Sequence, residues 1–215
     1  RWSSQETTST WTPTATNTAG SFRLTDGNQI NTAVRSRGAV MIWTDTALYQ
    51  MQFIGAPLTF GFKQIGSNCG AVGINAAVDV SGTSFWMSDD SFFLYDGAVK
   101  KIPCSVQDHV FDNINQNAKQ DVFCAANSDF NEVMWFYPSA NSTQIDKMVA
   151  YNYAENLWYV GTLARSAWAD SGVYEVPYAA EFEAEDTTAV VPNINGLKAG
   201  RTFVYLHETG VNDDG

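Results

Sequence analysis

The stretch DVFCAANSDFNEVMWFYPSANSTQIDKMVAYNYAENLWYVGT, residues 121–162, decides the fold class. Its runs of aromatic, branched and small apolar residues alternate with short polar connections, which is typical of antiparallel strands joined by turns. The runs that predict strands are residues 121–126, 132–137, 147–152 and 157–161. This stretch therefore predicts a four-stranded antiparallel meander.

The same pattern of apolar runs and short polar connections extends toward the N-terminus. Residues 40–43, 48–53, 85–87, 92–95 and 99–102 predict further strands, and Asp96-Gly97 is a hairpin-turn signal. The residues Trp43, Trp86 and Trp135 recur at intervals of 43 and 49 residues, near the ~40–50 residues of a propeller blade. We predict an all-β fold of propeller-like, antiparallel four-stranded blades, with a sandwich or barrel as the alternative.

One short helix is expected beside these strands. Val106, Val110, Phe111 and Ile114 share one helical face, and Ser105 is the expected N-cap.

Three segments are expected along the chain. Residues 1–37 are rich in threonine and predict an extended arm, or a strand of a preceding element. Residues 38–212 form the propeller-like domain, and residues 213–215 end a fragment. Because a propeller has at least four blades and this domain supplies at most four, we expect a partial propeller of a larger chain.

The charge and cysteine content restrict the function. The chain has 12 Lys+Arg against 23 Asp+Glu, a net charge of -11, which argues against a nucleic-acid clamp built on basic residues. No apolar run reaches the ~20 residues of a membrane span. Cys69, Cys104 and Cys124 lie among apolar or small residues and predict buried free thiols, which fits folding in a reducing cytoplasm.

The sequence indicates no catalytic or metal centre. His109 and His207 each lack a second histidine or cysteine at metal-ligand spacing, and no G-x-S-x-G motif positions a serine nucleophile. The glycine-rich residues 66–73 lack the Lys-Ser/Thr end of a phosphate loop. We therefore predict a protein that is not an enzyme, with no catalytic residue, no metal and no cofactor.

The residues of interest are accordingly structural. We expect core or blade-interface anchors, because large aromatic side chains bury much apolar area, at Trp43, Trp86, Trp135, Phe136, Tyr137 and Trp158. For partner contact we favour the N-terminal arm and the acidic segment 181–186, through Glu181, Glu183, Glu185 and Asp186.

Several segments together resemble a family of virion proteins. They are residues 92–97 with 102–111, residues 131–139, and residues 146–158 with 161–165. These turn and packing motifs are similar to those of tail hub or nozzle proteins of short-tailed bacteriophages, also described as packaged-DNA stabilisation or tail tubular proteins. The resemblance covers roughly residues 38–212.

The resemblance implies a structural role in the virion tail. It implies a homo-oligomeric ring beneath the portal and adaptor that retains packaged DNA, forms its exit channel and carries tail fibre or needle proteins. Double-stranded DNA would pass through without specific binding, and no membrane insertion is implied. The alternative is a carbohydrate-binding, receptor-recognition module of a virion or cell surface, because aromatic residues can stack on sugars.

Overall fold

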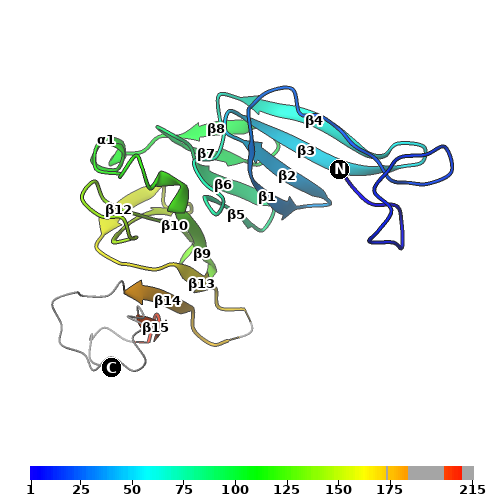
Figure 1. The fold of residues 1–215 in the computed structure, drawn as a ribbon. Helices are drawn as coiled ribbons and strands as arrows, with labels where there is room; N and C mark the ends of the chain where they lie inside the picture. The colour runs from blue at the N-terminus through cyan, green and yellow to red at the C-terminus, as the bar shows by residue number, and fades with distance from the viewer. Residues whose placement is uncertain (173, 184–200, 210–215) are drawn as a thin grey trace, which may run out of the picture.

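The computed structural model describes residues 1–172, 174–183 and 201–209. In these residues the chain forms four antiparallel sheets, together with one short helix and two turns of 3-10 helix (Figure 1). The prediction of an all-β fold with propeller-like blades and one short helix is confirmed, and the sheets do not close into a barrel.

The sheets follow the order of the chain. The first contains β1 (Ile30–Ser36), β2 (Ala39–Thr44), β3 (Ala47–Gly55) and β4 (Thr59–Ser67). The second contains β5 (Ala77–Val80), β6 (Thr83–Met87), β7 (Phe92–Tyr95) and β8 (Val99–Ile102). The third contains β9 (Phe123–Asn127), β10 (Glu132–Tyr137), β11 (Lys147–Asn152) and β12 (Leu157–Gly161). The fourth contains β13 (Ala167–Ala169), β14 (Tyr178–Glu183) and β15 (Arg201–Leu206).

The third sheet is the predicted meander. Its strands pair in the order β12-β11-β10-β9, and three of them have the predicted bounds. The remaining strand begins at Phe123 rather than at residue 121, because Lys119–Asp121 form a 3-10 turn. Asn131 and Asn156 take left-handed backbone conformations at two of the connections, which asparagine tolerates better than most residues.

The first strands of successive sheets lie next to one another. β1 contacts β5, β5 contacts β9, and β9 contacts β13. Figure 1 shows the four sheets following one another along an arc, with the first sheet and the fourth at opposite ends. Radiating sheets with neighbouring first strands are the arrangement of propeller blades.

The expected boundary at residue 37 falls inside the first sheet. β1 pairs along its length with β2, from Ile30 opposite Thr44 to Ser36 opposite Ala39. Residues 30–36 therefore belong to the first blade, because their backbone groups complete its hydrogen-bonded ladder. The threonine-rich residues before them form no named strand, but Trp2 and Gly20 share a β-bridge.

The helix is shorter than its sequence pattern. α1 spans Gln107–Phe111 and its N-cap is Val106, with no side-chain cap, so the expected cap at Ser105 is wrong. Ile114 lies beyond the helix but is still buried, at 5% exposure, so its side chain joins the core from the following loop.

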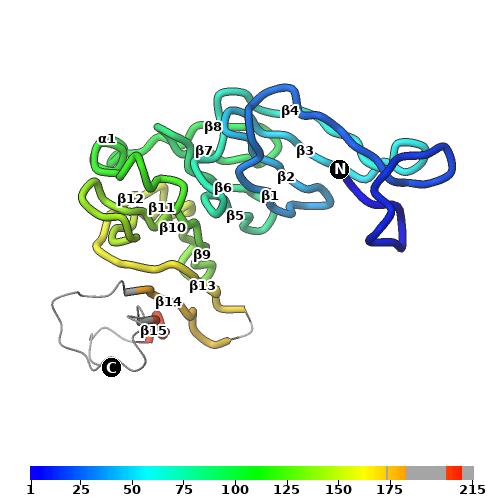
Figure 2. Tube along the Cα trace, viewed as in Figure 1, coloured from blue at the N-terminus to red at the C-terminus, as the bar shows by residue number. Residues whose placement is uncertain are grey.

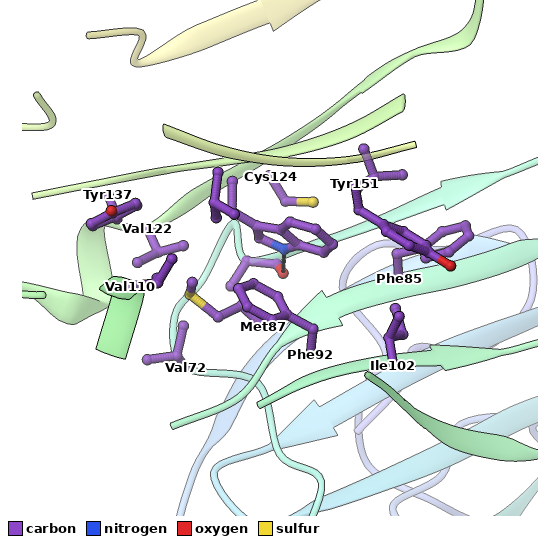
Figure 3. Packing of buried hydrophobic residues seen from close by; sticks show 14 of the residues in the cluster. Val72, Phe85, Met87, Phe92, Ile102, Val110, Val122, Cys124, Tyr137 and Tyr151 are labelled. Atoms are coloured by element: carbon purple, nitrogen blue, oxygen red, sulfur yellow. Dashed lines mark hydrogen bonds between the residues drawn. The ribbon is translucent and has the colours of Figure 1, made fainter. Parts of the chain in front are cut away.

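The largest core lies between the second and third sheets. Figure 3 shows Phe85, Met87 and Phe92 of the second sheet facing Cys124 and Tyr151 of the third. α1 contributes Val110 to the same core. Among the described residues, no helix has the length and apolar character needed to cross a membrane.

Candidate functional site

The tryptophans that recur in the sequence lie at the contacts between sheets. Trp43, Trp86 and Trp135 are each 0% exposed. Trp43 of β2 packs against Trp86 of β6 with ring centroids 5.4 Å apart, which joins the first sheet to the second. Trp135 of β10 packs against Phe92 of β7 at 4.8 Å, and this contact joins the second sheet to the third.

Trp158 and Phe136 lie on opposite faces of the third sheet. The half-buried Trp158 stacks on Trp135 at 6.0 Å, and its indole N–H donates to the carbonyl of Pro103 at 2.9 Å. Phe136 is 0% exposed and stacks on Trp168 of β13 at 6.2 Å. It therefore joins the third sheet to the fourth.

Tyr137 is buried beside Trp135 in the core between the second and third sheets. Burial, followed by the negative charge of Asp146, raises the pKa of Tyr137 above its ordinary value. This side chain is therefore a neutral phenol across the physiological range.

A buried arginine that the sequence analysis missed holds the fourth sheet in place. Arg165 lies in the connection from β12 to β13 and is 7% exposed. Its Nη1 donates to Glu181 Oε2 at 2.8 Å, and its Nε donates to His207 Nε2 at 3.0 Å. Its guanidinium also lies 4.1 Å from the ring centroid of Tyr205, a cation–π distance.

The acidic segment chosen for partner contact is only partly described. Glu181 forms the ion pair with Arg165 inside the molecule, so its carboxylate already has a partner. Glu183 is the last residue of β14. Glu185 and Asp186 lie outside the described residues.

Polar contacts add to the attachment of the fourth sheet. Ser128 donates its hydroxyl to Asp170, and Ser171 donates to Asp129. Each bond links the region after β9 to the region after β13.

A pocket of about 350 Å³ lies beside Arg165. Asn75, Gln120 and Asp121 line it together with Arg165, and Phe123 and Phe182 supply aromatic surface. Hydrogen-bonding groups beside aromatic rings are the chemistry that recognises a small polar molecule such as a sugar.

Two apolar surfaces at the ends of the arc are exposed, with no described residue of the chain covering them. The first, named here the hairpin tip, is residues 53–58 at the turn between β3 and β4, where Phe53, Ile54 and Leu58 are 69%, 52% and 65% exposed. The second, named here the outer face, belongs to the fourth sheet, where Val204 and Leu206 are 70% and 53% exposed.

The cysteines are thiols, and the described residues contain no cluster of three or more side chains able to hold a metal. Cys69 and Cys124 are buried and Cys104 is half-buried, all three free. Within the described ranges no group of His, Cys, Asp and Glu has the size of a metal site.

Comparison with known proteins found no family model and no curated protein that matches this chain.

Proposed function

We propose that this chain is a structural component of the tail of a short-tailed bacteriophage, of the hub or nozzle class, which acts by assembly rather than by catalysis. It would form a homo-oligomeric ring beneath the portal and adaptor, retain packaged DNA and line its exit channel. The observation that carries the proposal is the pair of exposed apolar surfaces at opposite ends of one arc of stacked blades. Exposed apolar patches mark sites of protein association.

The contacts between blades support a mechanical role. Aromatic side chains bridge each pair of successive sheets, at Trp43–Trp86, Phe92–Trp135 and Phe136–Trp168. Such pairs add about 0.5–1.5 kcal/mol each beyond their buried area. Sheets joined in this way should move as one body, which suits a channel under the pressure of packaged DNA.

The net charge supports the same role. At -11 per chain, a ring of several copies would surround DNA with negative potential, which discourages adhesion to phosphates.

The mass of the particle in solution tests this function. We expect analytical ultracentrifugation of the purified chain to give a closed oligomer of several 23.6 kDa subunits, visible as rings by electron microscopy. A chain that stays monomeric at high concentration contradicts the proposal.

A second candidate function is carbohydrate recognition, and the pocket beside Arg165 favours it. Isothermal titration against host surface polysaccharide separates the two functions. If the chain is a sugar-binding module, titration should give a heat of binding, and the double variant Asn75→Ala, Gln120→Ala should lose it. If the chain is a tail hub, titration should give no heat of binding.

A further inference from the structure

The hairpin tip projects from the body of the first sheet. β2 pairs with β3 only as far as Gln52, which lies opposite Ala39. Beyond that point β3 pairs with β4 alone, from Phe53 opposite Phe60 to Gly55 opposite Thr59. The tip is therefore a two-stranded hairpin that extends past its neighbouring strand.

The projecting tip is apolar on both sides. Ile54 and Phe53 are neighbours in one strand, so their side chains point to opposite faces, and Leu58 follows at the turn. No charged residue occurs between Asp45 and Lys63. The N-terminal segment supports the tip from one side, since Trp2 packs against Phe60 at 5.4 Å.

The outer face of the fourth sheet is apolar across all three strands. Residues directly opposite in antiparallel strands share a face, and the register pairs Tyr178 with Leu206, and Ala180 with Val204. β13 adds Ala167 and Ala169 opposite Ala180 and Tyr178. The reverse side carries Trp168 and the buried Ala179 and packs toward the third sheet.

The two surfaces lie far apart on one chain, so one molecule cannot bring them together. Figure 2 shows the β3–β4 hairpin and the β14–β15 pair at opposite ends of the trace. A contact between them must therefore join two molecules.

Charge complementarity favours that contact. The hairpin end is basic, because residues 1–65 carry five basic and three acidic side chains, and Arg23 and Lys63 are exposed. The end with the fourth sheet carries exposed acidic side chains at Glu175 and Glu208. Opposite charges around an apolar contact steer association and fix its orientation.

We propose that the hairpin tip of one copy docks on the outer face of the fourth sheet of a second copy, head to tail. The inference rests on the proposed assembly and names its interface. A head-to-tail contact uses two different surfaces, so copies add in one direction and close into a ring when the rotation permits.

Two variants and a mixing experiment test the interface. The tip variant is Ile54→Asp with Leu58→Asp, and the face variant is Val204→Lys with Leu206→Lys. Leu157→Lys is the matched control, because Leu157 is also an exposed apolar strand residue, at 57%, and lies in neither surface. Circular dichroism and melting of each variant establish that the substitutions leave the fold intact.

Each interface variant alone should be monomeric by mass photometry, and the control should assemble as the wild type does. Loss of anchor residues should weaken association at least ~10-fold. An equimolar mixture of the tip and face variants should give a species of two chains and nothing larger, because it restores one intact contact.

Several results would overturn the interface. If either variant assembles like the wild type, or the mixture stays monomeric, the contact is wrong while the ring proposal stands. A monomeric wild type removes the interface and the proposed function together. If the wild type floats with vesicles of phosphatidylcholine and phosphatidylglycerol and the tip variant does not, the tip serves a lipid surface instead.

Discussion

Trp43 and Trp86 are equally buried and touch edge to face, yet only one of them has a hydrogen-bond partner. Their rings meet at 62° with centroids 5.4 Å apart. The indole N–H of Trp86 donates to the carbonyl of Cys69 at 2.8 Å, whereas the N–H of Trp43 has no acceptor among the described residues. This pair joins the first two blades. Because only Trp86 has a hydrogen-bond partner, replacing each tryptophan in turn distinguishes the contribution of packing from that of the hydrogen bond.

Trp86→Phe should therefore destabilise the chain more than Trp43→Phe. Both substitutions leave a similar cavity, but only the first leaves the Cys69 carbonyl buried and unpaired. We expect a difference of about 1–3 kcal/mol in the free energy of unfolding, measured by urea denaturation. An equal or larger loss for Trp43→Phe would show that the hydrogen bond contributes nothing.

Arg165→Ala should release the fourth sheet while the other three stay folded. The substitution leaves Glu181 without its cation, and the expected cost lies at the lower end of the ~3–5 kcal/mol for a buried pair, because Glu181 is 26% exposed. Hydrogen exchange should rise in β13–β15 and not in β5–β12. Lys100→Ala, which breaks a surface ion pair with Asp96, is the control and should change neither region.

Mild acid should loosen the same sheet through His207. Burial, followed by the positive charge of Arg165, lowers the pKa of His207 from its ordinary value of 6.5. At this histidine the unfolded chain therefore binds a proton more readily than the native chain. The contribution of His207 to the free energy of unfolding is fully present above pH 6.5 and is lost as the pH drops below that value. The neighbouring groups are Arg165, its partner Glu181, and Trp168.

His207→Gln removes this pH dependence, because a glutamine carbonyl accepts the Arg165 hydrogen bond and does not titrate. Glu132 acts in the opposite direction. Burial raises its pKa above 4.5, so its contribution favours the native state as the pH falls. The melting temperature should change less between pH 7 and pH 5 in the His207→Gln variant than in the wild type. If the melting temperature of this variant depends on pH as steeply as that of the wild type, groups other than His207 cause the pH dependence.

The three thiols should differ in reactivity. Burial raises the pKa of Cys69 to about 11 and raises the pKa of Cys124, and both side chains are buried. Cys104 is half-buried, and burial raises its pKa as well. Because the thiolate is the reactive form, an aromatic disulfide reagent at pH 8 should modify Cys104 first and slowly. Three equally fast thiols in the native chain would contradict this packing.

The sequence predicted the elements whose signals are local. Residues 132–137, 147–152 and 157–161 combine apolar runs with turn residues at both ends, and the structure has strands with those bounds. The threonine-rich pattern places Ile30–Ser36 in the arm, because the pairing of this strand with β2 becomes visible only in the sheet.

The contacts around Arg165 could not be predicted from sequence. Arg165 lies 16 positions from Glu181 and 42 from His207, and no short motif links residues so far apart. The projection of the hairpin tip could not be predicted either, because Phe53 and Ile54 have the pattern of ordinary strand residues. Only the pairing of β2, which ends before them, shows that they project.

The most direct test of the proposed role is to ask whether the genome that encodes this chain yields virions, and to image those particles decorated with an antibody against the chain. We expect label confined to the tail, in a ring between the portal and the tail tip. Virions that carry no label, or carry it on the head alone, would contradict it.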